Sequence, residues 1–499
     1  MEENFKAAGI GILISLLVSG NLLFGKYVFL LDSVFGPNPK LFNYWSLGRI
    51  LFDLILYGIS KTIPWLYPKI FIFISVLLGY FCAWIFLKEK LKYSYVFALF
   101  YALNPFVYNR LIAGQIILVF SYAFFPLLLK LIEKSEVKRD IAAGAVIAFG
   151  IIQLHFIPFA LFLVAVFKFS EFFKTKSIAP LKSFGIILGI VLISNLGIAY
   201  QLASGGEVSR RFEEITLYQS HSFGPSSSEG LNYLTSLATL HGFWREKSYL
   251  QLWNFFPLWF LPFLLILYLS VLGYLSKAKY RNIFLFLALF GLILSAGIKA
   301  PVFSGIFKLL FEKVPLFSGY RDSQKFLIFL ILAYLYLGSQ GLKALPKKAY
   351  PLLILLPLYG IPMFFGFQGQ VGCADYPRDW YYAQKIIGEE KCIFFPWHRY
   401  MDFKWVPNRN KRIENPAYVF FKNAITSKNP EMEGIPPPQD KISVRVREFL
   451  LSRKLNTLRE LKVKYVILGK EADYKSYLWL ANCTELVVNG STLYLLRVE

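Results

Sequence analysis

The sequence predicts a polytopic α-helical membrane protein with a soluble α/β domain at its C-terminal end. Of the 499 residues 56% are hydrophobic and 18% are aromatic, and the mean hydropathy is +0.49. A soluble protein of this size has no need of so much apolar surface, so most of it is expected to face lipid. From about Gln368 the long apolar runs give way to short soluble-type segments. We therefore expect a transmembrane domain over 1–367 and an α/β domain over 368–499.

The net charge is +23, from 54 Lys and Arg against 31 Asp and Glu. These basic residues sit in short clusters between apolar spans, which is the orientation signal of a membrane protein and not the pattern of a nucleic-acid-binding surface. We expect membrane lipids as partners and no nucleic acid. The first apolar run, 7–24, leads into further apolar segments and lacks a small-residue cleavage site, so no cleavable signal peptide is expected.

About 20 apolar residues cross a bilayer, and on that basis we expect about eleven spans. They lie near 6–25, 69–87, 94–106, 115–132, 141–154, 156–169, 183–202, 252–275, 282–297, 325–340 and 350–367. The third is short, and the fifth and sixth are expected to form a half-depth hairpin that breaks around His155 and Pro158.

The loops between these spans predict the orientation. With a cytoplasmic N-terminus, every even-numbered loop is basic: 88–92, 130–139, 168–182, 277–281 and 343–348. The positive-inside rule then places the odd-numbered loops and the C-terminal domain outside a cell membrane. The outer loops also contain cations, which either lie near lipid headgroups or bind something anionic: Arg110, Arg210, Arg211, Arg245, Lys313, Arg321 and Lys325.

The C-terminal segment shows soluble α/β patterns. We expect a helix over 379–387, a strand over 392–395, a break at Pro436–Pro438, a long helix over 442–461 and a strand over 465–468. The segment from Glu485 is expected to be a hairpin on an Asn489-Gly490 turn. Two Asn-x-Ser/Thr sequons and three of the four cysteines, Cys373, Cys392 and Cys483, agree with an external location.

Asp32 follows the first span directly and precedes Gly36, Pro37 and Pro39, which prevent a continuing helix. An acidic residue at this depth is a candidate functional residue. It either caps the following turn or acts as a general base at the membrane surface. In the second case Arg49 and Asp53, in the next amphipathic segment, are expected to help line the same cavity.

The second outer loop, 104–115, is dense in hydrogen-bonding side chains, including Asn104, Tyr108, Arg110 and Gln115. Between two membrane spans such a run is costly unless something polar is bound there. The alternative is a simple Asn104-Pro105 turn beside an arginine that reaches the headgroups.

His155 lies in an otherwise apolar run and either makes an interhelical hydrogen bond or contacts a phosphate or a sugar hydroxyl. The long loop 203–251, which carries Arg210 and Arg211, is expected to cover a substrate.

The last outer loop carries Tyr320, Arg321 and Lys325 just before a span. Arg321 and Lys325 lie four residues apart, so on a helix they would share one face and grip a phosphate together. The alternative is an Arg–Asp capping arrangement at the start of a helix.

Several motifs are absent from the sequence. It contains no Walker A motif, no His-Glu-x-x-His and no Gly-x-Ser-x-Gly. It also lacks the Asp-x-Asp pair with which a nucleotide-sugar enzyme holds a divalent cation against a diphosphate. ATP-driven transport and nucleotide-sugar transfer are therefore disfavoured. We expect no cofactor and no required metal, with a divalent cation left open.

The chain resembles the GT-C superfamily of polyprenyl-phosphate-sugar-dependent glycosyltransferases, near archaeal and bacterial members such as mycobacterial arabinofuranosyltransferases and the membrane proteins that glycosylate teichoic acids. The resemblance rests on the overall layout and on four segments: Asp32 with 37–48, 104–115, 314–325, and 395–400. The Trp-Trp-Asp-Tyr-Gly segment of oligosaccharyltransferases is missing, which disfavours en-bloc transfer to asparagine.

The resemblance implies that Asp32 is the catalytic base of an inverting transfer from a polyprenyl- or dolichyl-phosphate sugar to a glycan acceptor. Arg110, Arg321, Lys325 and His155 would then bind the donor phosphate. The expected substrate-binding residues are Asn104, Tyr108, Gln115, Arg49, Asp53, Arg210, Arg211 and Tyr320. The rival hypothesis is a non-enzymatic flippase or exporter of lipid-linked glycans.

Overall fold

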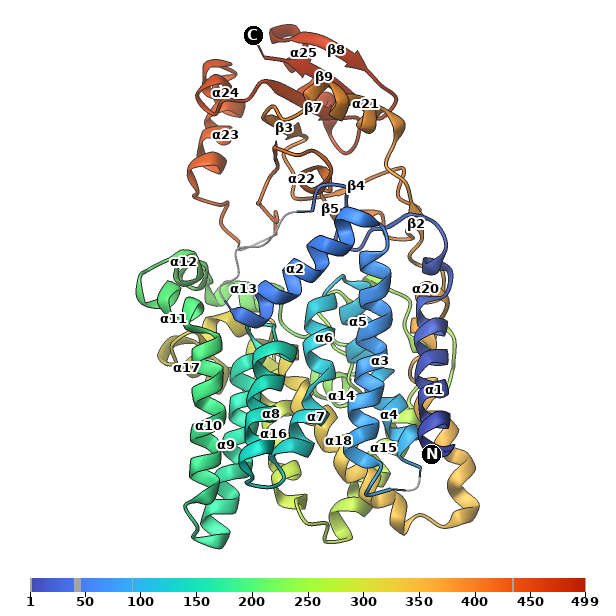
Figure 1. Ribbon diagram of the computed structural model, residues 1–499. Helices are drawn as coiled ribbons and strands as arrows, with labels where there is room; N and C mark the ends of the chain where they lie inside the picture. The colour runs from blue at the N-terminus through green and yellow to red at the C-terminus, as the bar shows by residue number, and fades with distance from the viewer. Residues whose placement is uncertain (1, 40–45, 92, 433–434, 499) are drawn as a thin grey trace.

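A computed structural model describes residues 2–39, 46–91, 93–432 and 435–498. A tall bundle of helices forms most of the molecule, and a C-terminal α/β region, residues 373–498, sits on one end of it (Figure 1). The chain begins at the opposite end of the bundle. The predicted class, a helical membrane protein with a small sheet near its C-terminus, is confirmed, while the domain boundary at residue 368 stays a prediction.

Six helical segments within the described residues are long and apolar enough to cross a membrane. They are Glu3–Leu23, Tyr67–Leu87, Phe156–Thr175, Arg281–Lys299, Ser323–Ala344 and Lys347–Gln368. A seventh consists of two helices, α10 (Ala179–Ser194) and α11 (Leu196–Ala203), bent by 69° at the break between them. The count of about eleven spans stays a prediction, because the remaining apolar segments are short or interrupted.

Proline and glycine positions explain the interruptions. The predicted third span is divided into α4 (Ser94–Ala102) and α5 (Pro105–Ile112), because Pro105 cannot continue a helix and Asn104 caps the next one by accepting from the Val107 amide at 3.2 Å. The fourth is divided into α6 (Ile116–Ala123) and α7 (Phe125–Ile132), and α15 (Leu261–Leu275) has 15 residues.

The predicted half-depth hairpin is wrong in its second arm. Its first arm is α8 (Val137–Ala145) continued by a π-turn over Val146–Gly150, and the chain does break before Phe156 as expected. However, α9 (Phe156–Thr175) runs for 20 residues and is apolar enough to cross a membrane. Pro158 does not shorten it, because proline is tolerated in the first turn of a helix.

The basic loops gather at one end of the bundle. Figure 1 shows the turns after α3 (Tyr67–Leu87), α9 and α15 at the end opposite the C-terminal region. Contacts join these loops: Lys90 lies 2.6 Å from Glu133, and Lys130 lies 2.8 Å from Glu89. The segregation of charge agrees with the positive-inside pattern, and the orientation itself stays a prediction.

The C-terminal region is built on a five-stranded mixed sheet of order β6-β3-β7-β9-β8. Strand β3 (Cys392–Phe395) runs parallel to β6 (Ala424–Ile425) and to β7 (Tyr465–Gly469), and β9 (Leu493–Arg497) is antiparallel to both β7 and β8 (Glu485–Asn489). Helix α21 (Arg378–Ile387) and strands β3 and β7 lie where the sequence predicts them. All four cysteines are described, and no disulfide joins any two of them.

Two local predictions in this region are wrong. The expected helix over 442–461 is two helices, α23 (Lys441–Ser452) and α24 (Asn456–Glu460), because Arg453 takes a left-handed conformation with φ of 56° and ends the first. The last hairpin does not turn on Asn489-Gly490 alone. Its loop spans 490–492 and is held from outside by Asp379, which accepts from the Thr492 amide at 2.6 Å and from the Thr492 hydroxyl at 2.7 Å.

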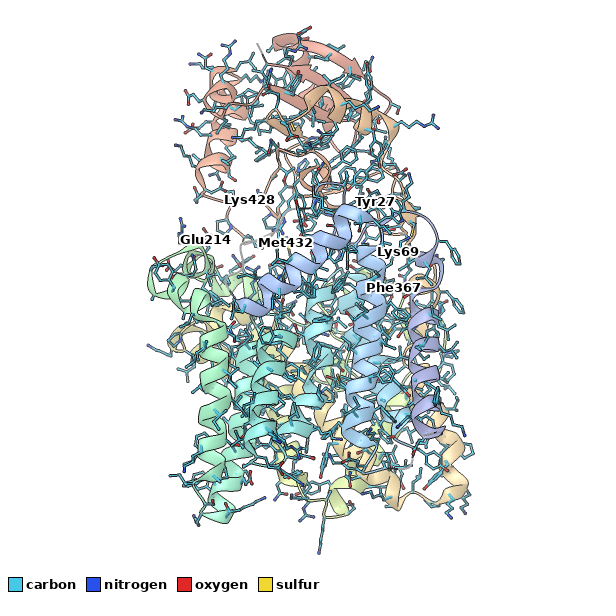
Figure 2. All side chains as sticks on the ribbon, in the orientation of Figure 1. Tyr27, Lys69, Glu214, Phe367, Lys428 and Met432 are labelled. Atoms are coloured by element: carbon cyan, nitrogen blue, oxygen red, sulfur yellow. The ribbon has the colours of Figure 1, made fainter. Side chains whose placement is uncertain are left out.

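The first outer loop lies at the junction of the bundle and the C-terminal region. Strand β1 (Tyr27–Val28) pairs with β2 (Cys373–Ala374), and Asn408 donates to the Phe29 carbonyl at 2.6 Å. Tyr27 and Lys69 mark this junction in Figure 2. The loop that carries Asp32 is therefore clamped from both sides.

The remaining α-helices and strands are α2 (Leu47–Thr62), α12 (Glu207–Glu213), α13 (Leu217–Ser222), α14 (Tyr233–Ala238), α17 (Ser304–Lys313), α19 (Leu355–Leu358), α20 (Phe364–Gln368), α22 (Ala417–Phe420), α25 (Leu480–Cys483), β4 (Tyr400–Asp402) and β5 (Arg412–Glu414). All of them except α19 and α20 lie outside the candidate spans. Helix α1 (Glu2–Ser19), α16 (Arg281–Ala296) and α18 (Leu327–Gly341) lie within the spans given above.

Candidate active site

Asp32 is held by hydrogen bonds from two distant parts of the chain. Its Oδ1 accepts from the Tyr400 hydroxyl in β4 at 3.0 Å, and its Oδ2 accepts from Nε2 of Gln115 at 3.2 Å. The Asp32 amide donates to the Ala113 carbonyl at 2.9 Å. Among the described residues no ion pair involves this carboxylate, so both of its oxygens are oriented by neutral donors.

Gly114 permits this arrangement. Its φ of +84° is a conformation that side chains rarely adopt, and an added Cβ would lie 2.8 Å from the Ser33 amide nitrogen and 3.0 Å from that of Asp32. The Asp32 loop therefore packs directly on the backbone of the second outer loop. Sequence reasoning did not single out Gly114 for this role.

Burial raises the pKa of Asp32 above its usual range. The hydrogen bonds from Gln115 and Tyr400, followed by the charges of Arg399 and Arg245, oppose the shift without cancelling it. A carboxylate with a raised pKa is a stronger proton acceptor than an exposed one, which suits a general base.

A second polar layer supports Tyr400. Arg399 Nε lies 3.0 Å from Glu414 Oε1, and the Glu414 amide donates to the carbonyl of Leu31 at 3.0 Å. Burial raises the pKa of Glu414, although Arg399 opposes this. Sequence reasoning placed Arg399 and Tyr400 in a segment of interest but not in the site, and it did not single out Glu414.

Arg110 forms a buried network next to Asp32. Its side chain is fully buried, and its two Nη atoms donate to the Asp322 carboxylate. The same guanidinium donates to Gln115 at 2.8 Å and to Gln324 at 2.6 Å. Gln115 thus accepts a hydrogen bond from Arg110 and donates one to Asp32. Arg110 therefore orients the Gln115 side chain, and Gln115 in turn orients the Asp32 carboxylate.

Arg321 and Lys325 flank this network. They do not share a face of one α-helix as expected, because Arg321 follows one 3₁₀ turn and Lys325 lies in the next, with Asp322 between them. Lys325 Nζ is 4.0 Å from the Asp322 carboxylate. Arg321 donates to the Gln219 side chain of α13, and its guanidinium lies over the Phe223 ring at 4.7 Å. The capping alternative is also wrong, since the Asp322 side chain pairs with Arg110 and caps nothing.

His155 and Tyr320 pack together beside these cations. The Tyr320 hydroxyl donates to the His155 carbonyl at 2.9 Å, and the two rings are 5.8 Å apart. The Nδ1 atom of His155 lies 3.2 Å from the Gln153 amide. The imidazole is close enough to Lys325 and Arg321 for their charges to act on it.

Other predicted site residues have local partners away from Asp32. Asn104 caps α5, and its amide donates to the Tyr101 carbonyl at 2.8 Å. The Tyr108 hydroxyl accepts from Gln370 at 2.9 Å and donates to the Leu250 carbonyl. Both residues contribute to the support of the site, and their binding roles stay predictions.

The charged residues on α2 and in the long loop, which the sequence predicts to bind substrate, also make no hydrogen bond or ion pair with Asp32 among the described side chains. Arg49 Nε contacts both carboxylate oxygens of Asp53, at 2.9 and 3.0 Å, as a pair within α2. Arg210 is exposed on α12. The side chain of Arg211 lies outside the described residues.

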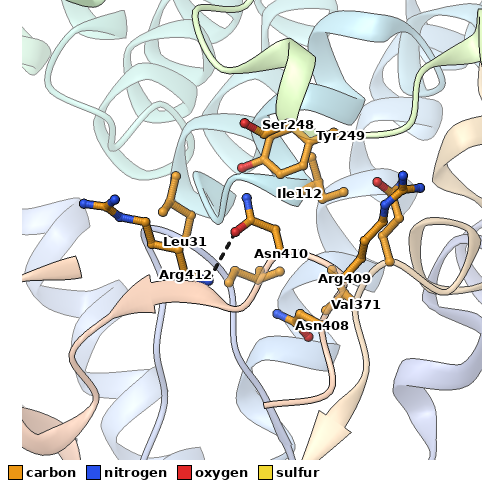
Figure 3. Close-up of a pocket in the computed structure, with 11 residues that line it drawn as sticks. Leu31, Ile112, Ser248, Tyr249, Val371, Asn408, Arg409, Asn410 and Arg412 are labelled. Carbon is orange, nitrogen blue, oxygen red and sulfur yellow. Dashed lines mark hydrogen bonds between the residues drawn. The ribbon is translucent and has the colours of Figure 1, made fainter. Parts of the chain in front are cut away.

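A small pocket opens beside the Asp32 loop (Figure 3). Leu31, Ile112 and Tyr249 line it from the bundle side, and Arg409 and Arg412 line it from the C-terminal region. The pocket places two guanidinium groups at the junction that holds Asp32.

No group of three or more His, Cys, Asp or Glu side chains suited to a metal ion occurs within the described ranges. The expectation that no metal is required stays a prediction.

Two of the solved structures that are similar to this chain are of arabinofuranosyltransferase AftD from Mycobacteria. One aligns with a TM-score of 0.62 and 11% identity, and the other with 0.58 and 9%. Each alignment covers 98% of this chain but 41% of the other, so this chain spans about two fifths of that protein's length. No family model and no curated protein matches the sequence.

The fold is that of a polytopic helical membrane protein, and nearly the whole chain aligns with the fold of arabinofuranosyltransferase AftD. The resemblance predicted from the sequence is confirmed at the level of the fold, because the alignment with a membrane arabinofuranosyltransferase covers nearly the whole chain. At this low identity the activity of that enzyme belongs to the proposal below.

Proposed function

We propose that this protein is a membrane glycosyltransferase that moves a sugar from a polyprenyl-phosphate donor to an extracytoplasmic glycan acceptor with inversion. One observation carries the proposal: the partly accessible Asp32 carboxylate is oriented by Gln115 and Tyr400 at the junction between the bundle and the C-terminal region. The GT-C fold supports it. In this proposal Asp32 accepts the proton of the attacking acceptor hydroxyl.

The cations near Asp32 suit the second requirement of the reaction, the departure of the lipid phosphate. Lys325 and Arg245 are close enough to Asp32 for their charges to interact with it, and Arg321 lies on the same loop as Lys325. Charge that develops on the departing lipid phosphate would be stabilised by such groups. Arg110 has both Nη atoms engaged, so we assign it the positioning of Gln115 and keep Arg321, Lys325 and His155 as the phosphate-binding candidates.

The proposal is tested with the purified protein in lipid vesicles. We expect it to release polyprenyl phosphate from a polyprenyl-phosphate sugar when an acceptor is present, and to leave nucleotide sugars intact. A protein that moves the lipid-linked sugar across the bilayer without cleaving it would instead be the flippase of the rival hypothesis.

Tyr400 should influence the pH below which the transfer rate falls, which is the acid limb of the pH–rate profile. The Tyr400 hydroxyl stabilises the charged form of Asp32 and so lowers its pKa. In Tyr400→Phe this bond is lost, the pKa of Asp32 rises further, and activity should begin to fall at a higher pH than in the native protein. Rates measured across pH for both proteins check this, and an unmoved acid limb would remove Asp32 as the titrating base.

We further propose that the C-terminal region faces the outside of the cell and the N-terminus the cytoplasm. Cys483 is exposed in that region, so it provides a natural probe. A membrane-impermeant maleimide should label the protein on intact cells mainly through Cys483, and Cys483→Ser should remove most of the labelling. Lys279→Cys in the Cys483→Ser protein should react only after permeabilisation. The reverse result would invert the topology.

A further inference from the structure

A second cavity lies at the far end of the bundle from Asp32. It measures about 290 Å³ and is lined by Ser170 and Lys174 of α9 and by the turn 277–283 that joins α15 to α16. This volume is near the lower end of the range in which proteins bind small ligands and lipid headgroups. Nothing in the proposed transfer reaction uses it.

The cavity is strongly basic. Four cations line it, Lys174, Lys277, Lys279 and Arg281, and none of its nine lining residues is acidic. Among the described residues, none of these four cations takes part in an ion pair within 4.0 Å. Their positive charge is thus left without a protein counter-charge.

The nearest acidic groups already have other partners. Glu133 and Glu171 are close enough for their charges to act on Lys279. However, Glu133 pairs with Lys90 at 2.6 Å, and Glu171 accepts from Ser135 at 2.9 Å. The cavity therefore keeps a surplus of positive charge that an anion would relieve.

Aromatic contacts hold two of the cations in place. The guanidinium of Arg281 lies over the Tyr274 ring at 5.2 Å and donates to the Tyr274 carbonyl at 3.3 Å. The ammonium of Lys279 lies over the Tyr280 ring at 4.8 Å. The charges are therefore partly preorganised, which reduces the entropy lost when a ligand binds.

Exposed apolar side chains lie close in sequence to the residues that line the cavity. Phe173, next to Lys174, is 62% exposed, and Leu275, two residues before Lys277, is 64% exposed. Both belong to helices that run through the bundle. A basic cavity at the end of apolar helices that also expose large apolar side chains matches the two ends of a lipid, a charged headgroup and an acyl chain.

We propose that this cavity binds the phosphate headgroup of an anionic membrane lipid in the leaflet opposite Asp32. The four cations hold the headgroup, and the exposed side chains of Phe173 and Leu275 contact its acyl chains. The site is separate from the proposed transfer reaction and does not depend on it.

Binding of phosphatidylglycerol to the purified full-length protein, measured by native mass spectrometry against phosphatidylcholine, tests the proposal. The triple variant Lys277→Gln, Lys279→Gln, Arg281→Gln should lose about tenfold or more in affinity for phosphatidylglycerol, since each cation near a lipid headgroup contributes severalfold. Phosphatidylcholine binding should not change. Thermal unfolding of both proteins checks that the variant is folded.

The matched control removes the same number of charges from another loop at the same end, in Lys343→Gln, Lys347→Gln, Lys348→Gln. Its affinity for phosphatidylglycerol should stay within about twofold of the native value. Equal losses in the two variants would mean diffuse attraction to the basic end and would overturn the site. Displacement of the lipid by millimolar inorganic phosphate would also overturn it, in favour of a soluble phosphate ligand.

Discussion

The change Asp32→Asn should lower transfer by about 10²–10⁴-fold, because it keeps the size of the side chain and removes the proton acceptor. In the variant the amide oxygen can accept from Gln115 and the amide nitrogen can donate to the Tyr400 hydroxyl, so the loop should keep its place. We expect donor binding and thermal stability close to those of the native protein. Single-turnover release of polyprenyl phosphate measures the effect on the chemical step.

Asp53→Asn is the matched control. Asp53 is a second buried carboxylate near the same end of the bundle, and it pairs with Arg49 within α2. Its loss should reduce turnover per folded molecule by less than about tenfold, since it removes a positioning ion pair and no proton acceptor. Near-native transfer by the Asp32→Asn protein would place the base elsewhere, and a larger loss in Asp53→Asn would point to α2.

Arg110→Ala should have the largest effect on stability, a loss of about 3–5 kcal/mol. The reason is that Asp322 would be left as a buried charge without its main partner. Burial alone would raise the pKa of Asp322, and Arg110 and Lys325 instead hold it below its usual range. Unfolding of the detergent-solubilised protein, followed by circular dichroism, measures the loss.

The double variant Arg110→Ala, Asp322→Ala distinguishes the loss of the ion pair from the cost of leaving Asp322 buried without Arg110. Removing both charges should recover part of the lost stability, because Asp322 is no longer a buried charge without Arg110. The recovery should be incomplete, because Lys325 then loses Asp322 as its counter-charge. Activity should not recover, because Gln115 has still lost the arginine that orients it. Native stability in Arg110→Ala alone would contradict the buried network.

Much of the fold could be predicted from local sequence. Apolar length predicts helices such as α3 and α18, and basic loops predict which ends of the helices meet. Strands β3 and β7 follow from short apolar runs between turn residues. The errors arose where a distant contact or a single backbone angle decided the outcome, as with Asp379 at the last hairpin and Arg453 between α23 and α24.

The site could be predicted only in part. Asp32, Gln115 and Arg110 lie near membrane boundaries with strong local signals, and the structure brings these three together. Tyr400 is 368 positions from Asp32, and Asp322 is 212 positions from Arg110. A single sequence contains no local pattern that reveals such pairings, because they depend on how the C-terminal region and the last outer loop fold back onto the first.

The central claim is that the protein cleaves a polyprenyl-phosphate sugar at Asp32. The most direct test follows polyprenyl phosphate and the anomeric configuration of the product when purified protein in vesicles receives a labelled donor and a glycan acceptor. We expect release of polyprenyl phosphate by the native protein, an inverted anomeric centre in the product, and near-complete loss of both in Asp32→Asn. Donor that stays intact with the native protein, or equal release by Asp32→Asn, would contradict it.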